Sequence, residues 1–478
     1  MTQHPTSFSP AERTHMDPLP PGEWVQRELL SGEPDDRCIW MGGPITRGEL
    51  TRLVDAHQRL LESHGLRPGG TVALQLPPSV EYIATLLAAW RIGAQVSLLD
   101  HRLVRGEVDR ALDRLAPQVV VTAQDMISAP MAGYARVVAR AAARADGRPA
   151  TTSHVLIQLS SGSTGPSKVI ARTAADLVGE LGRYEKLDEY PGPGERIVLL
   201  ASIVHVLGLV GGLLHSLHAG TELIFPLRLT ADGIRAAVTA GTEPTMLLGV
   251  PFHAELLTTG GDPLPQLTRM VVAGELVRPW LPGAFTARYE VPLGTMYGMT
   301  ELGVIATDLS GRHAPAVAPA PGMRLRVADG ELLVKMAASP YIGLADETRW
   351  VDGWLHTKDA AAIDPATGLV TILGRLDSQI SIGGLKVDLT EVEQTLCALP
   401  QVDSAVVAYD SEIEAYLVLR EGSAKSDIES VLTEQLAPYK RPRHMYVLES
   451  LPRTTTGKIT RDRALLRAAA GALPPVSP

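Results

Sequence analysis

The fold class is decided by residues 71–122, where three apolar runs of strand length alternate with two helical patterns. The strand-like runs are Thr71-Val-Ala-Leu-Gln-Leu76, Ala94-Gln-Val-Ser-Leu-Leu99 and Gln118-Val-Val-Val-Thr122. Residues 80–92 and 106–115, which separate these runs, have the apolar spacing of amphipathic helices. Because strands joined by helices pair in parallel, this alternation predicts an α/β fold in which helices wrap parallel-rich sheets.

The rest of the chain divides into three regions. Residues 1–22 are polar with several prolines, and we expect a flexible lead-in. Residues 23–376 continue the alternation and predict one large N-terminal domain. Residues 377–478 alternate short strands and helices over about 100 residues, enough for a small α+β C-terminal domain. Within the large domain, residues 136–148 are rich in Ala and Arg, and we expect a surface helix or linker there.

Composition disfavours several classes of function. The chain has 478 residues and a formal net charge of −9, whereas nucleic-acid binders normally carry a basic excess. The most apolar stretch, residues 203–217, is interrupted by His205, His215 and glycines and is too short to span a membrane. The two cysteines, Cys38 and Cys397, cannot form a disulfide framework. We expect a soluble, cytoplasmic protein with no nucleic-acid and no membrane partner.

The most informative motif is a hydroxyl- and glycine-rich loop, Leu159-Ser-Ser-Gly-Ser-Thr-Gly-Pro-Ser-Lys168. Glycines let backbone N–H groups converge on an anion, hydroxyls add donors and the lysine adds charge, so this composition predicts a phosphate-binding loop. It is neither the P-loop pattern nor a nucleophile elbow, because Ser161 stands where the elbow needs glycine. A flexible Ser/Gly linker is the alternative.

This loop resembles that of the adenylate-forming superfamily, which comprises acyl- and aryl-CoA synthetases, peptide-synthetase adenylation domains and luciferases. The family loop is usually written Thr-Ser-Gly-Thr-Thr-Gly-x-Pro-Lys-Gly. The chain departs from it at Ser167 and Val169, where proline and glycine are usual. The matching residues, which the resemblance assigns to ATP binding, are Ser161, Gly162, Ser163 (as a hydroxyl equivalent), Thr164, Gly165 and Lys168.

A second motif, Tyr297-Gly-Met-Thr-Glu301, resembles the family's aromatic-Gly-x-Thr-Glu segment. The resemblance implies that Tyr297 stacks on adenine, that Thr300 contacts the α-phosphate and that Glu301 holds Mg²⁺. A carboxylate beside a triphosphate is a natural ligand for a hard cation. A helix-capping Thr followed by an exposed Glu is the alternative.

A third motif, Gly353-Trp-Leu-His-Thr-Lys-Asp359, resembles the family's Gly-Trp-x-x-Thr-Gly-Asp. By this resemblance Asp359 accepts hydrogen bonds from the ribose hydroxyls, as an ionised carboxylate can. Lys358 replaces the usual glycine, which leaves the local backbone geometry open.

Two further motifs complete the family order. Gly374-Arg-Leu-Asp377 resembles the hinge segment: Arg375 is expected to contact ribose or phosphate, and the mobile small domain is expected to pivot at Asp377. Pro452-Arg-Thr-Thr-Thr-Gly-Lys458 resembles the family's Pro-x-Thr-x-x-Gly-Lys, which makes Lys458 the candidate for the adenylation lysine. Most lysines are simply solvated, and that is the alternative for Lys458.

The acyl site is the least specific part of the resemblance. In Val204-His205-Val206-Leu207-Gly208, His205 matches a family histidine near the substrate carboxylate, and this position favours it over His215 and His218. No Asp occurs in residues 199–217, which disfavours α-amino acids, and Val206 replaces the Asn typical of hydroxybenzoate activators. We expect a hydrophobic acid, aromatic or alicyclic. The predicted acyl pocket comprises Val206, Gly249, Ala273 and Gly298, and the predicted nucleotide-binding residues also include Gly274, Glu275 and Gly298.

The resemblance implies a two-step ligase. ATP and Mg²⁺ would convert a small-molecule carboxylic acid into an acyl-AMP with release of pyrophosphate, and a CoA thiol would then take the acyl group. A phosphopantetheine thiol on a carrier protein, or another nucleophile, is an alternative acceptor. A non-catalytic nucleotide-binding relative is a second alternative, against which the retention of Lys458 argues, because a binding module has no use for it.

Overall fold

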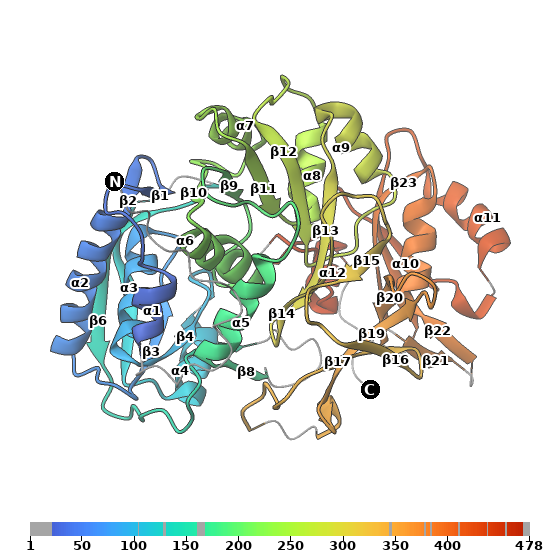
Figure 1. Cartoon of the computed structure of the whole chain (residues 1–478). Coiled ribbons are helices and arrows are strands. Elements are labelled where there is room, and N and C mark those ends of the chain that lie inside the picture. The colour runs from blue at the N-terminus through green and yellow to red at the C-terminus, as the bar shows by residue number, and fades with distance from the viewer. Residues whose placement is uncertain are drawn as a thin grey trace.

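The computed structural model describes residues 22–471 except 104, 128–130, 160–167, 344–346, 377–378, 383–384, 410–411, 437 and 455–456. Over these residues the strands form two large and two small sheets (Figure 1). The two large sheets belong to the N-terminal part, and the small ones follow in the C-terminal part.

The first large sheet contains the stretch from which the fold class was predicted. Its order is β6-β5-β3-β4-β7-β8, in which β3 pairs in parallel with β4 and β5, and β4 pairs in parallel with β7. The strands are β3 (Thr71–Gln75), β4 (Gln95–Leu98), β5 (Val119–Ile127), β6 (Arg136–Ala143), β7 (Leu156–Leu159) and β8 (Val169–Arg172). Helices α2 (Arg47–Ser63), α3 (Val80–Ile92) and α4 (Arg105–Leu115) accompany them. The predicted alternation is confirmed.

The expectation of a helix or linker at residues 136–148 is wrong for most of that range. Residues 136–143 form the edge strand β6, which pairs antiparallel with β5. The physical reason lies in the burial pattern, because Val137 and Ala141 face the core whereas Val138, Arg140 and Ala142 are exposed. The Ala and Arg content resembles that of a helix, but pairing with a long neighbouring strand outweighs that weak local preference.

The second large sheet has a parallel half and an antiparallel half. Its order is β16-β17-β19-β20-β15-β14-β13-β12-β11-β9-β10-β1-β2, with β18 paired to β19. The parallel neighbours are β1 (Arg37–Trp40), β10 (Glu222–Ile224), β9 (Arg196–Leu199), β11 (Thr245–Gly249), β12 (Leu267–Ala273) and β13 (Leu293–Met299). The antiparallel strands are β2 (Pro44–Thr46), β14 (Gly303–Asp308), β15 (Ala316–Pro319), β16 (Leu325–Ala328), β17 (Glu331–Lys335), β18 (Trp350–Val351), β19 (Trp354–Ile363) and β20 (Val370–Arg375).

Helices between the two sheets join them through one core. The elements α5 (Ala174–Tyr184), the π-helix η2 (Leu207–Leu214) and α6 (His215–Ala219) contribute to a buried cluster that also contains Leu98 of the first sheet and Val271 of the second. Helices α7 (Ala231–Thr239), α8 (Pro251–Thr258) and α9 (Leu281–Tyr289) pack with a second cluster on the larger sheet, and α1 (Glu23–Glu28) packs near α3. Within the described ranges, no helix is long and apolar enough to cross a bilayer.

The C-terminal part has its own sheets and its own core. It contains the pair β21 (Gln379–Ile382) and β22 (Leu385–Asp388) and the three strands β23 (Val402–Tyr409), β24 (Ile413–Leu419) and β25 (His444–Val447). Its helices are α10 (Leu389–Ala398), α11 (Lys425–Gln435) and α12 (Arg463–Ala469), with a short 3-10 turn at Pro438–Lys440; another 3-10 turn, Glu347–Arg349, precedes β18 in the large domain. A large sheet-rich α/β N-terminal domain with a small α+β C-terminal domain is the fold class that the sequence predicted.

Candidate active site

Several of the predicted site residues that the structure describes follow the carboxyl ends of parallel strands. His205 follows β9, Gly274 and Glu275 follow β12, and Thr300 and Glu301 follow β13. Carboxyl ends of parallel strands are where open α/β sheets bind ligands. Lys168 precedes β8, whereas the predicted loop residues Ser161, Gly162, Ser163, Thr164 and Gly165, and the hinge residue Asp377, lie outside the described residues.

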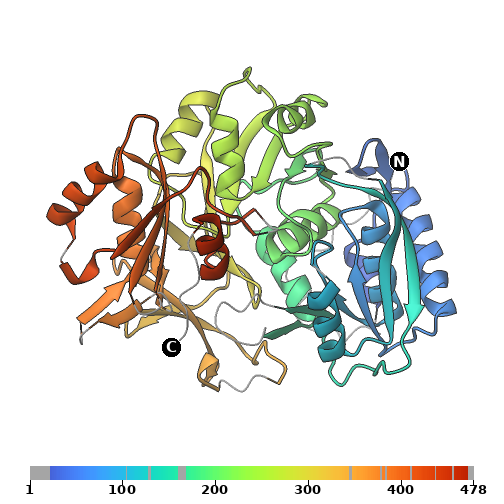
Figure 2. The ribbon, with the colours of Figure 1, turned by 180° about the vertical axis from the view of Figure 1, so that it is seen from behind.

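Lys458 reaches this edge from the small domain. A Cβ placed on Gly274 would lie 3.1 Å from the Lys458 Nζ, so the ammonium lies directly against the backbone after β12. Gly274 has a φ of +90°, a conformation that favours glycine, and any larger residue there would push the lysine away. Figure 2 shows the red C-terminal segment running from the small domain toward the larger sheet. Residues far apart in the sequence are therefore brought together as predicted.

Electrostatics around Lys458 are those of a partly desolvated cation. Burial lowers the pKa of the Lys458 ammonium, and the nearby Glu275 carboxylate opposes this shift. Burial in turn raises the pKa of Glu275, against the effects of Lys458, Arg453 and a hydrogen bond from the Ile459 amide. The two groups thus stabilise each other's charged form.

Two contacts join the small domain to the large domain. The Arg453 guanidinium stacks 4.6 Å above the centre of the Phe252 ring of α8 and donates a 2.7 Å hydrogen bond to the Gly457 carbonyl. Arg278 of the large domain donates a 3.1 Å bond to the Asp403 carbonyl of the small domain. The small domain is thereby docked with its lysine inside the site.

His205 lies close enough to Lys458 for the two groups to interact electrostatically. The imidazole is solvent-accessible, yet protein surrounds it closely, so that desolvation, reinforced by the Lys458 charge, lowers its pKa to about 4. His205 is therefore neutral at pH 7. Its carbonyl accepts from the Leu209 amide at 2.8 Å at the start of η2, and π-helices are rare and often mark functional sites. The competing His215 is instead a core residue, 1% exposed, whose Nε2 lies 2.8 Å from the Pro191 carbonyl.

Tyr297, Asp359 and Arg375 form one hydrogen-bonded group. The Tyr297 hydroxyl donates to Asp359 Oδ2 at 2.6 Å, and Arg375 Nη1 donates to Asp359 Oδ1 at 3.2 Å. Asp359 and Arg375 are register partners on β19 and β20, which fixes their spacing. Burial together with the Asp359 charge raises the pKa of Tyr297, which therefore remains a phenol donor. The sequence motifs placed these three residues in one site, and the geometry agrees.

Lys358 adopts a left-handed backbone conformation, which favours glycine. Its φ is +61°, and its amide donates a 2.8 Å bond to Glu331 Oε1, while its Nζ lies 3.6 Å from Glu331 Oε2. His356 also donates to Glu331, through Nδ1 at 3.0 Å. Burial alone would raise the pKa of Glu331, but these donors lower it overall. Glu331 thus stabilises the left-handed backbone conformation of Lys358, the residue that precedes Asp359.

Thr300 and Glu301 lie in the turn of the β13–β14 hairpin, where Met299 and Gly303 are register partners. The Glu301 side chain is 6% exposed, and its Oε1 accepts a 2.7 Å bond from the Tyr341 hydroxyl. No cluster of three or more metal-ligating side chains occurs among the described residues. One carboxylate in a turn that the motif predicts to contact phosphate fits Mg²⁺, because this ion commonly takes one or two carboxylates together with substrate phosphates and water.

The four predicted acyl-pocket residues have different surroundings. Val206 is half-buried at the start of η2, and Ala273 is buried at the end of β12. A Cβ on Gly249 would lie 2.9 Å from His253 Nδ1, and one on Gly298 would lie 2.5 Å from the Gly303 carbonyl. Close packing therefore explains both glycines, and their contact with an acyl group stays a prediction.

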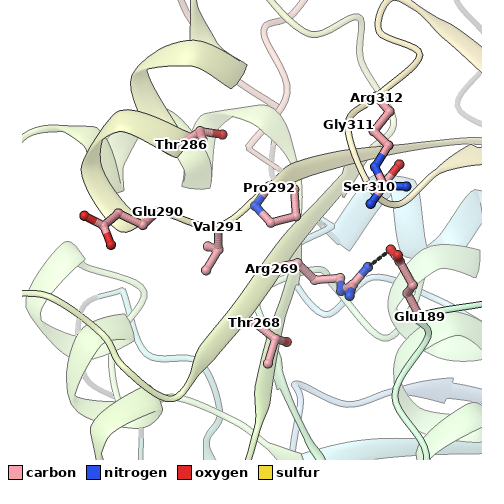
Figure 3. A pocket seen from close by; sticks show the side chains of 10 residues that line it. All are labelled: Glu189, Thr268, Arg269, Thr286, Glu290, Val291, Pro292, Ser310, Gly311 and Arg312. Carbon is pink, nitrogen blue, oxygen red and sulfur yellow. Dashed lines mark hydrogen bonds and ion pairs between the residues drawn. The ribbon is translucent and has the colours of Figure 1, made fainter.

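A separate surface pocket lies away from these residues. It is lined by Arg269, Glu189, Arg312 and neighbours, and an ion pair joins Arg269 to Glu189 (Figure 3). None of the predicted site residues lines it.

Two residues that support the candidate site, Glu331 and Tyr341, were not predicted from the sequence, because neither lies in a motif.

Comparisons with known proteins agree with this geometry. A model of the AMP-binding enzyme family matches residues 27–336, and one of the AMP-binding enzyme C-terminal domain matches residues 391–458. The chain is 25% identical to a probable CoA ligase of Humulus lupulus (89% of this chain, 92% of that protein) and 25% identical to the benzoate–CoA ligase of Thauera aromatica (91% and 94%). Its fold matches that of ATP-bound MatB from Rhodopseudomonas palustris with a TM-score of 0.79 at 21% identity, covering 94% of this chain and 98% of that one. The chain therefore belongs to the AMP-binding enzyme family, the adenylate-forming superfamily that includes the acyl- and aryl-CoA synthetases.

Proposed function

We propose that this protein uses ATP to activate a carboxylic acid as its acyl-AMP, releases pyrophosphate and transfers the acyl group to the thiol of CoA. The observation that carries the proposal is the convergence of Lys458 with Gly274, Glu275 and His205 at the carboxyl end of the larger sheet. A lysine delivered by a separate domain, partly desolvated and near the carboxylate of Glu275, suits charge stabilisation at a reacting phosphate.

In the first step a carboxylate oxygen attacks the α-phosphorus of ATP, and the bond from that phosphorus to the bridging oxygen of pyrophosphate breaks. The carboxylate is already ionised at pH 7, so no general base is needed. Negative charge on the phosphate oxygens is offset by the Lys458 ammonium and by donors from Thr300. The proposed loop donors, Ser161 to Gly165 with Lys168, add to these. Neutral His205 lines the position of the substrate carboxylate and can donate one N–H to it.

The nucleotide is held by the Tyr297–Asp359–Arg375 group. The Asp359 carboxylate accepts from Tyr297 and Arg375, and an ionised carboxylate has about four lone-pair sites, so it can also accept from the ribose hydroxyls. The Tyr297 ring is oriented by its own hydroxyl, which suits stacking on adenine. Arg375 then lies within reach of ribose or phosphate.

Magnesium is part of the proposal, with Glu301 as its protein ligand. When bound, the ion supplies positive charge beside the phosphates. Tyr341 orients the Glu301 carboxylate by donating to Oε1. The proposed ligand of the ion is the second carboxylate oxygen, Oε2. The chain's own contribution is therefore to hold this carboxylate at the phosphate-binding turn.

For the second step, the small domain (residues 377–478) rotates about Asp377 and withdraws Lys458, so that a thiol can reach the acyl carbon. The thiolate attacks the carbonyl carbon, and the bond to AMP breaks. Among the described residues, this motion would break the Arg278 bond to the Asp403 carbonyl and the Arg453–Phe252 stack. Asp377→Pro should slow thioester formation more than acyl-AMP formation, and unchanged thioester formation would contradict the hinge.

The acid is proposed to be hydrophobic, aromatic or alicyclic, since Val206, Ala273 and the glycines 249 and 298 offer no charged partner. A cytoplasmic setting is proposed because both cysteines, Cys38 and Cys397, are unpaired thiols.

The proposal is tested by acid-dependent exchange of pyrophosphate into ATP. Lys458→Ala should lower the exchange rate by about 100-fold or more, because it removes a cation from the reacting phosphate. Lys425→Ala is the matched control: Lys425 is an exposed residue of α11 that pairs with Glu429 at 3.5 Å, and its loss should change nothing. Equal rates for the two variants would contradict the assigned role of Lys458.

A further inference from the structure

A completely buried ion pair lies behind the site and takes no direct part in it. Arg172 Nη1 of β8 lies 2.6 Å from Glu180 Oε2 of α5, and the two side chains are 2% and 0% exposed. Burying two charges is costly unless further hydrogen bonds satisfy them. Arg172 Nη2 also donates to the Asp176 carbonyl at 3.1 Å. The ion pair uses only Oε2 of Glu180, so the second carboxylate oxygen, Oε1, needs a donor of its own.

That second oxygen holds the base of the β13–β14 hairpin. Glu180 Oε1 accepts a 3.1 Å bond from the Val304 amide, and Arg183, one turn along α5, donates a 2.8 Å bond to the Leu302 carbonyl. Two charged side chains of one helix thus form hydrogen bonds to the backbone on either side of Gly303. These bonds lie at the end of the turn that contains Thr300 and Glu301.

The Glu180 carboxylate lies so close to the hairpin backbone that residue 303 has no room for a side chain. The φ of Gly303 is +79°, and a Cβ there would lie 1.9–2.1 Å from the Glu180 carboxylate atoms. Only glycine allows the carboxylate to approach the hairpin backbone in this way.

The other end of the ion pair leads to the phosphate loop. Arg172 ends β8, the second strand of the β7–β8 hairpin, and the predicted phosphate loop is the connection between those strands. The same strand also positions Tyr341, since Ala171 donates to the Pro340 carbonyl at 2.8 Å and Ile342 donates to the Val169 carbonyl at 3.0 Å. The two hairpins with proposed triphosphate contacts are therefore tied to each other through α5.

We propose that Glu180 is a positioning residue for the triphosphate of ATP: paired with Arg172, it fixes the Thr300–Glu301 turn relative to strand β8. This inference rests on the proposed function, because it assigns both hairpins to the phosphates. It does not concern the adenosine group, which Tyr297 and Asp359 bind.

This division predicts a selective defect. Glu180→Gln keeps the shape and an acceptor for Val304 but leaves Arg172 uncompensated, so the turn shifts or loosens. Calorimetry with ATP and Mg²⁺ should show affinity about tenfold or more below that of the wild type, the usual range for losing a residue that orients a ligand-binding group. Adenosine affinity should not change. Glu222→Gln is the matched control, because Glu222 pairs with the buried Arg196 at 3.8 Å at the far end of the parallel strands.

Each outcome is informative. Unchanged ATP affinity in Glu180→Gln, or equal weakening of ATP and adenosine, would overturn the positioning role. If that variant does not fold, Arg183→Met removes only the donor to the Leu302 carbonyl; it should weaken ATP binding selectively, and unaltered binding would overturn the inference. A wild-type protein that binds no ATP would refute the proposed function itself, and the role of Glu180 with it.

Discussion

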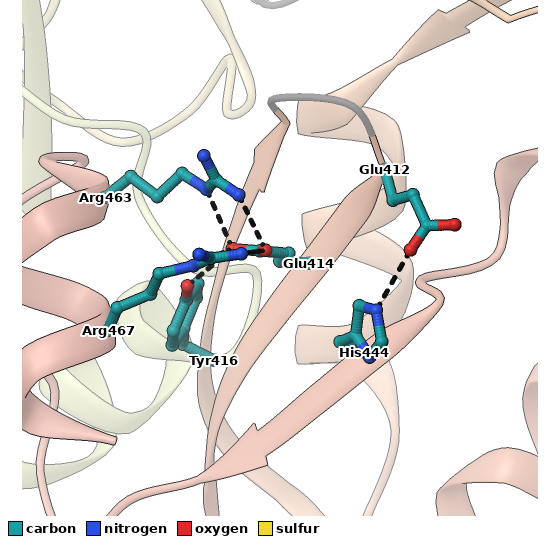
Figure 4. Close-up of polar contacts among 6 residues, drawn as sticks. All are labelled: Glu412, Glu414, Tyr416, His444, Arg463 and Arg467. Atoms are coloured by element: carbon teal, nitrogen blue, oxygen red, sulfur yellow. Dashed lines mark hydrogen bonds and ion pairs between the residues drawn. The ribbon is translucent and has the colours of Figure 1, made fainter. Parts of the chain in front are cut away.

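Glu414 is predicted to anchor the helix that follows the Lys458 segment. It is 1% exposed on β24 and accepts from Arg463 at 2.9 and 3.0 Å, from Arg467, and from the Tyr416 hydroxyl at 2.7 Å (Figure 4). Both arginines belong to α12. Loss of the carboxylate leaves two guanidinium groups facing one another, so the perturbation of choice is Glu414→Gln.

The magnitude follows from the carboxylate's pKa. Burial acts to raise it, but hydrogen bonds from Arg463, Arg467 and Tyr416 lower it from 4.5 to about 2. A shift of this size corresponds to about 3 kcal/mol of stability, similar to breaking a buried pair. Because the folded-state pKa is depressed, this stability is present above pH 4.5 and is lost as the pH falls toward 2. At pH 4, about 1 kcal/mol of it should already be gone.

The assay is hydrogen exchange of the backbone amides of Arg463–Ala469, normalised to intrinsic rates. At pH 7, Glu414→Gln should speed their exchange by about 100-fold, since each 1.4 kcal/mol is a factor of ten, and the difference from wild type should shrink at pH 4. The control is Glu412→Gln, whose ion pair with His444 at 2.9 Å is exposed and should contribute at most about 1 kcal/mol. Equal effects of the two substitutions, or a difference that does not change with pH, would refute the reasoning.

Three further predictions concern the site. Lys358→Gly should leave the melting temperature nearly unchanged, whereas Lys358→Val should destabilise by about 1–2 kcal/mol in thermal unfolding, because φ is +61° there; equal melting of the two variants would contradict the strain. Burial lowers the pKa of Lys458 while Glu275 opposes that shift, so Glu275→Gln should move the alkaline loss of pyrophosphate exchange to lower pH, and an unmoved limb would contradict the pairing. Tyr297→Phe removes one donor to Asp359 and should raise the KM for ATP severalfold with little change in the KM for the acid; equal changes in both would indicate a general defect.

Much of the fold was readable because apolar runs and helical spacing are local signals. The strands at 71–75, 95–98 and 119–127 follow from such runs. The edge strand β6 was not readable, because its Ala and Arg content favours a helix and only pairing with β5 overrides that preference. A single sequence carries no direct signal for such long-range pairing.

The site shows the same division. Motifs drew attention to Lys458, Tyr297, Asp359 and Arg375, and the structure places the first of these beside Gly274. The supporting residues were not readable, since Tyr341 approaches Glu301 only through the pairing of its segment with β8.

Supports such as Glu331 and Glu180 act through geometry that no short pattern encodes. Glu331 binds the amide of a left-handed residue, and Glu180 fits against a glycine more than 100 positions away. Their roles depend on contacts made only after the chain has folded.

The central claim, acid activation followed by transfer to a thiol, is tested most directly by pyrophosphate release from ATP and Mg²⁺ over a panel of carboxylic acids, with and without CoA. The account predicts release that depends on one class of hydrophobic acid, with CoA consumed as a thioester. Acid-dependent release without CoA consumption would contradict CoA as the acceptor and point to a carrier-protein thiol or another nucleophile. ATP binding without release for any acid would contradict the ligase itself.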